Sequence, residues 1–263
     1  MVKNNNKKNN GTNALRGLLA FLVALAVFLG VELIPQLTEN LGSDNHPSYT
    51  EASDIYEGSY KSRLSLDDIA PFDGEPYIVV NGNVPFFTEA DVTTEPFELF
   101  SELDDLGRCG TAYANVCQEL MPTEKRGSIG MVKPSGWQLA KYDFVDGKYL
   151  YNRCHLLGYQ LTGENANVKN LITGTRYLNI TGMLPFENEI ADYVHETNNH
   201  VLYRVTPVFE GDNLVANGVL MEALSVEDDT IEFCVFCYNV QPGVKIDYGT
   251  GLNWADAEYS AEN

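Results

Sequence analysis

The chain is poor in positive charge. Its 263 residues include 17 lysines and arginines against 37 aspartates and glutamates, and the formal net charge is −20 at pH 7. Proteins that hold nucleic acid by overall charge are basic, because lysine and arginine neutralise phosphates and release counterions. The composition therefore excludes a simple electrostatic nucleic-acid binder and is typical of a solubilising acidic surface. Cations nevertheless gather in the middle of the sequence, where we expect a local positive groove: Lys125, Arg126, Lys133, Lys141, Lys148, Arg153, Lys169 and Arg176.

Cysteine is also scarce, and its spacing excludes the common metal and redox motifs. Cys234 and Cys237 form a CxxC pattern, but they lie in an apolar, β-rich run where positions i and i+3 point to opposite faces. No second pair and no nearby histidine completes a zinc site there. Cys109 and Cys117 could form a disulfide in an oxidising compartment or remain free. We expect Cys154 to be a buried free thiol.

The N-terminal part holds a long apolar run. Residues 17–31 are uncharged and almost wholly apolar, and four basic residues precede them. This run is short for a spanning helix, which needs about 17–25 residues, and long for a signal-peptide core. No Ala-x-Ala-like site follows, so we expect residues 1–37 to form an uncleaved signal anchor with its basic end in the cytoplasm. A cleaved signal, which would release the protein, is the alternative.

A tether and one α+β domain are expected after this segment. Residues 38–70 are polar and acidic without sustained periodicity, which indicates a tether. Residues 71–263 are numerous enough to bury one core. The predicted strands cover residues 77–80, 137–144, 148–155, 200–208, 213–226 and 232–240, the second and third being joined as a hairpin at Asp146-Gly147. The predicted helices cover residues 98–106 and 185–197, and residues 159–170 read as a polar loop.

Several stretches of this domain carry a family resemblance. They are Glu124–Trp137, Asn170–Asn179, Gly182–Asn188 and the motif Asn152-Arg153-Cys154-His155. Over roughly residues 71–247 the chain resembles the DNA/RNA non-specific endonucleases of the ββα-metal superfamily, most closely the bacterial DNA-entry and streptococcal secreted nucleases. The resemblance implies an α+β fold with a ββα-metal nuclease core on a central antiparallel sheet, preceded by the N-terminal membrane-anchor helix.

The resemblance also implies roles for three polar residues. His155 would be the catalytic base, since an imidazole with a pKa of about 6.5 accepts a proton at neutral pH. Asn179, 24 residues later, would bind the metal, and its amide oxygen suits Mg²⁺, for which Mn²⁺ may substitute. A helix N-cap is the alternative for Asn179. Glu187 would accept hydrogen bonds from metal-bound waters, and a solvated helix carboxylate is its alternative.

Three arginines are candidates for phosphate contacts. Arg153 lies two residues before His155, so it should share a strand face with the base and could bind a phosphate oxygen bidentately. Arg126 and Arg176 are further candidates, with ordinary surface arginines as the alternative. The family motif usually reads Asp-Arg-Gly-His, so Asn152 cannot supply the aspartate's charge. Cys154 is harmless in place of glycine only if its backbone has ordinary strand dihedrals.

These observations predict a Mg²⁺-dependent endonuclease that hydrolyses DNA and RNA without sugar preference. We expect it to be held in the cell membrane with its catalytic domain outside, or secreted if the signal is cleaved, and to need no organic cofactor. A non-catalytic surface DNA receptor that kept the fold is the alternative, favoured by Asn152 and the acidic charge. A secreted toxin nuclease is a third possibility, opposed by the anchor.

Overall fold

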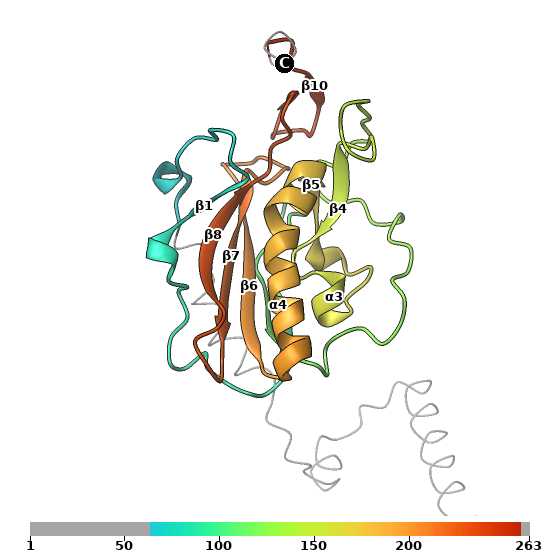
Figure 1. Cartoon of the computed structure of the whole chain (residues 1–263). Coiled ribbons are helices and arrows are strands. Elements are labelled where there is room, and N and C mark those ends of the chain that lie inside the picture. Colours follow the sequence, from blue (N-terminus) through green and yellow to red (C-terminus); the bar gives the residue numbers. More distant parts are fainter. Residues whose placement is uncertain (1–63, 259–263) are drawn as a thin grey trace, which may run out of the picture. The chain divides into compact units, whose positions relative to one another are not determined.

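A six-stranded antiparallel sheet organises the domain. The computed structural model describes residues 64–258 (Figure 1). In spatial order the strands of the sheet are β1 (Tyr77–Val79), β8 (Glu232–Tyr238), β7 (Gly218–Ser225), β6 (Val201–Val208), β3 (Ala112–Val116) and β2 (Phe97–Phe100). The smaller strand pairs are β4 (Tyr151–His155) with β5 (Leu171–Thr175) and β9 (Val244–Ile246) with β10 (Asn253–Ala255).

The helical segments are short except for one. The α-helices are α3 (Tyr159–Thr162) and α4 (Leu184–Thr197), and a π-helix, η5 (Leu178–Met183), leads directly into α4. The 3₁₀ turns are η2 (Leu66–Asp68), η3 (Asn81–Asn83) and η4 (Val168–Asn170). The strand pair β4–β5 followed by α4 gives the order strand, strand, helix. The α+β class and the central antiparallel sheet are therefore as expected.

Helix α4 covers one face of the sheet, across β6, β7 and β8 (Figure 1). Its buried residues recur at helical spacing, which is why this stretch forms an amphipathic helix. Ile190 and Val194 belong to a core that also contains Met221 and Val235 from the sheet. Pro185 lies at the start of α4, as the sequence predicts, directly after the π-helix.

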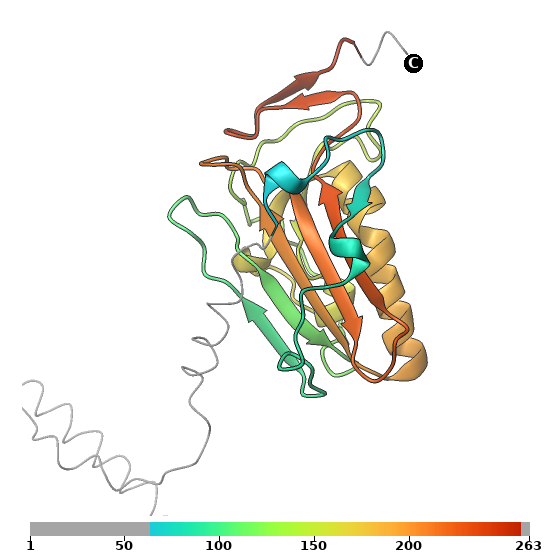
Figure 2. The same cartoon turned by 90° about the vertical axis from the view of Figure 1, so that its left-hand side faces the viewer.

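The opposite face of the sheet is covered by the beginning of the described chain, which Figure 2 shows across β7 and β8. Leu64, Leu66 and Ile69 pack against a core cluster that includes Phe236. The Tyr238 hydroxyl donates a 2.6 Å hydrogen bond to the Ala70 carbonyl. Residues 64–70 are therefore part of the domain, and the predicted tether boundary at residue 70 was wrong.

A buried ion pair lies between β6 and β7. Arg204 and Glu222 are direct cross-strand neighbours, and two hydrogen bonds of 2.8 Å join the guanidinium to the carboxylate. The Glu222 carboxylate also accepts a 2.8 Å hydrogen bond from the Phe86 backbone N–H, and Arg204 lies 4.6 Å from the Phe87 ring centroid. The pair thereby fixes the chain segment at Phe86 on the sheet.

Two local predictions were wrong because pairing partners lie far away in the sequence. The expected helix over residues 98–106 is strand β2 followed by a turn, since Phe97–Phe100 pairs with β3. The strand predicted over residues 148–155 is confirmed as β4 at Tyr151–His155, but its pairing with residues 137–144 is limited to an isolated bridge at Lys141 and Tyr149, because β4 pairs with β5 instead. The polar loop over residues 159–170 contains α3 and η4, and the sequence did not indicate β3 or β5 as strands.

All five cysteines are free and buried, so the possible Cys109–Cys117 disulfide does not form. Cys234 and Cys237 belong to the core clusters on opposite faces of the sheet, as the strand alternation predicts. Within residues 64–258, no helix has the length and apolar character needed to cross a membrane. The expected signal anchor and most of the expected tether lie outside the described residues.

Candidate active site

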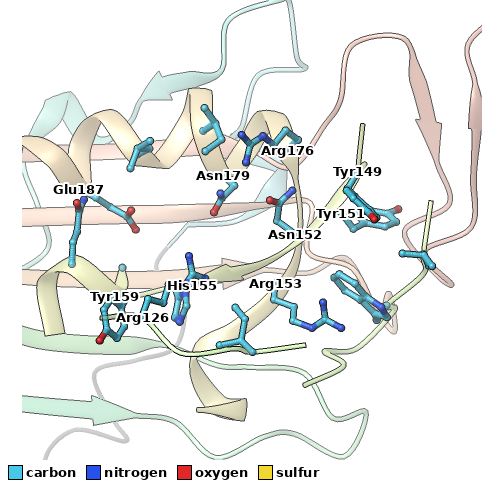
Figure 3. Close-up of a pocket in the computed structure, with 17 residues that line it drawn as sticks. Arg126, Tyr149, Tyr151, Asn152, Arg153, His155, Tyr159, Arg176, Asn179 and Glu187 are labelled. Atoms are coloured by element: carbon cyan, nitrogen blue, oxygen red, sulfur yellow. Dashed lines mark hydrogen bonds between the residues drawn. The ribbon is translucent and has the colours of Figure 1, made fainter. Parts of the chain in front are cut away.

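A cleft of about 740 Å³ opens between β4, the π-helix with α4, and the loops that lead to them (Figure 3). All six candidate residues from the sequence line it, from segments far apart in the chain. Aromatic and apolar side chains complete the wall. The lining residues are Arg126, Ile129, Trp137, Leu139, Tyr149, Tyr151, Asn152, Arg153, His155, Gly158, Tyr159, Gln160, Arg176, Asn179, Ile180, Leu184 and Glu187.

His155 ends strand β4 and is only 6% exposed. Its Nε2 lies 2.9 Å from the Asn165 carbonyl oxygen, which can only accept, so Nε2 bears the proton. Its Nδ1 lies 3.3 Å from a guanidinium nitrogen of Arg126, which can only donate. Nδ1 is therefore the nitrogen with the lone pair. Burial, with the Arg126 charge adding to it, lowers the pKa of His155 to about 4, so the ring is neutral at pH 7.

Asn179 is the second residue of the π-helix, and Tyr177 is the residue that precedes that helix. The helix-cap alternative for Asn179 is therefore wrong. The amide oxygen of Asn179 accepts a hydrogen bond from the Cys154 thiol, with Sγ and Oδ1 3.1 Å apart. The thiol thus holds the amide in one orientation at the wall of the cleft.

The π-helix explains how Asn179 and Glu187 reach the same cleft. In a continuous α-helix, positions eight residues apart point about 80° away from each other. A π-turn takes more residues per turn, so each residue of η5 advances by a smaller angle. The two side chains are thereby brought close to alignment, and Figure 3 shows both on the cleft side of the helix. Single π-turns of this kind are frequent at functional sites.

Glu187 is a buried carboxylate, 8% exposed, in the first turn of α4. Burial raises its pKa to about 8, and the positive charge of Arg126 opposes that rise. Gly158 lies against the carboxylate so closely that a Cβ there would be 2.8–2.9 Å from its atoms. Within residues 64–258, burial and the Arg126 charge are the only influences on the pKa of this carboxylate, and no hydrogen bond contributes. The alternative of a solvated helix carboxylate is therefore wrong.

The three arginines are held to different degrees. Arg153 donates to the Val132 carbonyl and, at 2.8 Å, to the Gly130 carbonyl, and its guanidinium lies 4.1 Å from the Trp137 ring centroid. Arg176 forms hydrogen bonds of 2.7 and 3.0 Å with Asp146. Among the described residues, Arg126 has neither a carboxylate nor a carbonyl partner and contacts only Nδ1 of His155, so it is the arginine best placed to meet an incoming anion.

The departures from the family motif are accommodated locally. Cys154 is fully buried within a regular strand and has no positive φ, so the condition for a harmless replacement of glycine is met. Space for it exists because residue 174 is glycine, where a Cβ would come within 2.6 Å of the Cys154 Cβ. Asn152 lines the cleft, and its buried Nδ2 has no hydrogen-bond partner in the described part of the chain.

Other contributors were not identified from the sequence. Asn165 and Gly158 act through a carbonyl and through the lack of a side chain, and neither has a signature in a single sequence. Tyr159, whose hydroxyl donates a 2.8 Å bond to the Glu124 carbonyl, ties the Arg126 segment to the cleft. Trp137 lies within a stretch that carried the family resemblance, but its contact with Arg153 has no signal in the sequence.

Comparisons with known proteins identify a family model, a curated relative and solved structures that are similar to this chain. The family model for DNA/RNA non-specific endonucleases matches residues 89–227. A curated deoxyribonuclease of Streptococcus dysgalactiae subsp. equisimilis is 32% identical over 108 residues, which are 39% of this chain and 32% of that protein. The chain thus matches about a third of the length of this relative.

Two solved structures share the fold. NucA from Streptococcus agalactiae, solved with a magnesium ion bound, aligns with a TM-score of 0.62 at 24% identity over 81% of this chain and 98% of NucA. Sda1 nuclease, solved with a bound zinc ion, aligns with a TM-score of 0.58 at 23% identity over 73% of this chain and 100% of Sda1. At these identities the likeness establishes the fold alone.

Proposed function

Because the chain belongs to the DNA/RNA non-specific endonuclease family, a family of metal-dependent nucleases, we propose that its cleft hydrolyses phosphodiester bonds of DNA and RNA. The observation that supports this most directly is the arrangement at His155. One ring nitrogen is bound to a backbone carbonyl, and the other presents its lone pair at a cleft lined by three arginines, Asn179 and Glu187.

His155 acts as the general base. The Asn165 carbonyl fixes the tautomer and the ring orientation, so Nδ1 accepts the proton of the attacking water. The water oxygen bonds to phosphorus as the bond from phosphorus to the 3′ oxygen breaks, which leaves a 5′-phosphate. The low pKa of His155 keeps the base unprotonated at neutral pH.

Through Arg126, binding of the substrate frees Nδ1 of His155 to accept a proton. In the structure it donates towards Nδ1 of His155, the nitrogen that must accept the proton. A phosphate offers charged oxygens, which are stronger acceptors than an imidazole nitrogen. When a phosphate enters the cleft, Arg126 turns to it and leaves Nδ1 to the water. Arg153, its donors partly engaged with backbone carbonyls, and Arg176, paired with Asp146, contribute positive charge at the edges of the cleft.

The cleft fits a hydrated divalent cation, and we assign Mg²⁺ with Mn²⁺ as a substitute. Asn179 offers a neutral, hard oxygen, and Glu187 is a buried carboxylate without a hydrogen-bond donor among the described residues, as expected for a group that accepts from metal-bound waters. The chemistry that such a cation supplies when bound is stabilisation of negative charge on the departing oxygen. Cys154 holds the ligand amide in place.

Two matched histidine variants of the full-length chain test this function. His155→Ala should reduce kcat for cleavage of circular plasmid in Mg²⁺ by about 10²–10⁴, the usual contribution of a general base. His195→Ala is the control, because His195 is exposed on α4 and outside the cleft. Cleavage by His155→Ala within a few-fold of wild type would refute the assignment of the base. Binding of plasmid by the wild-type chain without cleavage in Mg²⁺ would favour the receptor alternative, which Asn152 supports.

We propose that this activity is exerted outside the cell by a membrane-anchored protein. The support is the basic N-terminus followed by the apolar run of residues 17–31. The full-length protein should fractionate with membranes and be cut by protease added to intact cells. Recovery of most of the protein from the medium, with a new N-terminus beyond residue 34, would show a cleaved signal instead.

A further inference from the structure

A second group of metal-binding side chains lies at the end of the ladder between β3 and β6. The last residue pair of that ladder is Val116 with Val201, so Cys117 and His200 are the next residues on the two neighbouring strands. Glu119 lies in the turn after β3. One ligand atom from each of Cys117, Glu119 and His200 lies within 4.8 Å of the other two. A thiol, an imidazole and a carboxylate therefore converge although His200 is far away in the sequence.

A fourth residue prepares the imidazole for metal binding. The Nδ1 atom of His200 lies 2.6 Å from a carboxylate oxygen of Glu227, and the His200 backbone N–H donates a 2.9 Å hydrogen bond to the other oxygen. The Val226 N–H donates to the His200 carbonyl at 3.0 Å, which fixes this segment against the strand end. Glu227 thus holds the ring in place and leaves Nε2 as the nitrogen that can bind. Metal-binding histidines almost always have such a carboxylate or carbonyl partner.

We propose that Cys117, Glu119 and His200 bind a zinc ion, with Glu227 orienting the histidine. Sulfur, nitrogen and oxygen donors of these types are the ligands zinc prefers, and three protein ligands leave the fourth tetrahedral position to water. The two anionic ligands, thiolate and carboxylate, neutralise the charge of the ion. Mg²⁺ requires oxygen ligands and does not compete for a thiolate, so this site and the catalytic cleft select different metals.

The bound ion would link segments that adjoin the ends of neighbouring strands of the sheet. Cys117 is buried at the end of β3, His200 precedes β6, and Glu227 follows β7. Cys117 and Glu119 also begin the segment that continues to Arg126 in the cleft. The bound ion would therefore stabilise the start of the segment that carries Arg126.

Cobalt substitution in the full-length chain tests the proposal. After removal of metals with EDTA, Co²⁺ alone should produce the visible bands of tetrahedral cobalt and a thiolate-to-cobalt charge-transfer band, which Zn²⁺ should displace. Cys117→Ser should abolish the charge-transfer band, and the matched variant Cys109→Ser, another buried free thiol, should retain it. Glu227→Gln should weaken binding about 10–100-fold, the usual effect of losing the partner of a metal-bound histidine.

A second readout separates this site from the catalytic one. Zn²⁺ at about a hundred times its Kd should raise the Tm of the wild-type chain by about 5–10 °C, because it binds only the folded state. The shift should disappear in Cys117→Ser and persist in Asn179→Ala. Absence of a charge-transfer band at a large excess of Co²⁺, or its persistence in Cys117→Ser, would overturn the proposal. Neither result bears on the nuclease activity.

Discussion

The buried carboxylate of Glu187 should make the proposed Mg²⁺ requirement depend on pH. Its pKa is raised to about 8 by burial, so without a metal the side chain is mostly protonated at pH 7. A protonated carboxyl is a poor acceptor for the hydrogens of metal-bound waters, so the cation favours the ionised form. Binding of Mg²⁺ must then release a proton below pH 8, and the affinity for Mg²⁺ must rise as the pH rises.

The size of the effect follows from the pKa. If only the ionised form holds the cation, the Mg²⁺ concentration that gives half-maximal rate increases relative to high pH by about 100-fold at pH 6, about 10-fold at pH 7 and about 2-fold at pH 8. His155 does not obscure this dependence, because its pKa of about 4 leaves it neutral throughout that range. The base is therefore constant while the metal requirement changes.

The assay is initial cleavage of plasmid or a labelled oligonucleotide over a series of Mg²⁺ concentrations between pH 6 and pH 9. Glu187→Gln is the matched control, since the amide has the same shape and does not titrate. Its half-saturating Mg²⁺ should be high and nearly independent of pH. Calorimetry in two buffers of different ionisation enthalpy should detect the released proton for wild type alone. Equal pH dependence in the wild type and Glu187→Gln would refute the reasoning.

Three further predictions concern residues that support the site and the fold. Cys154→Ala removes the hydrogen-bond donor to Asn179, so the half-saturating Mg²⁺ concentration should rise by up to about tenfold, which corresponds to the net value of one hydrogen bond. Cys154→Ser keeps a donor and should stay near wild type. Equal half-saturating concentrations for both variants would exclude a role for the hydrogen bond. Gly174→Ala should lower the free energy of unfolding by about 1–3 kcal/mol, because the added methyl group overpacks against Cys154. The loss should be smaller in a Cys154→Gly background. Urea titration of the wild type, the two single variants and the double variant measures both losses. Glu222→Ala leaves Arg204 buried without its partner and should cost about 3–5 kcal/mol of stability in the same assay; a loss below 1 kcal/mol would contradict that.

The elements predicted correctly are those whose pattern is complete within a short window. Helix α4 has its proline start and its apolar spacing within its own residues, and the strands β6 and β8 are rich in β-branched, aromatic and other apolar residues. Strand β2 was mistaken for a helix because its four residues are defined by pairing with β3. Strand β5 is likewise defined by β4, across the segment that contains α3.

The same distinction applies to the site. The six candidate residues in the cleft could be named from their motifs, since the sequence specifies side-chain chemistry directly. The Asn165 carbonyl, the close approach of Gly158 and the π-turn that aligns Asn179 with Glu187 depend on backbone geometry, and their sequence signals are weak. The cluster of Cys117, Glu119 and His200 joins two separate segments, and Glu227, which contacts His200, lies in a third, so no spacing rule for zinc ligands detects it.

The acidic composition and a nucleic-acid substrate are compatible because charge acts locally. Charges separated by more than about 8 Å are largely screened at physiological ionic strength, so the approaching phosphate responds mainly to the cleft. Arg126, Arg153 and Arg176 line it, and the carboxylate of Glu187 is mostly neutral there until a cation binds. The cleft is therefore cationic in an acidic protein. The surrounding acidic surface repels phosphates elsewhere, which directs the polyanion to the cleft and weakens binding at other places on the surface.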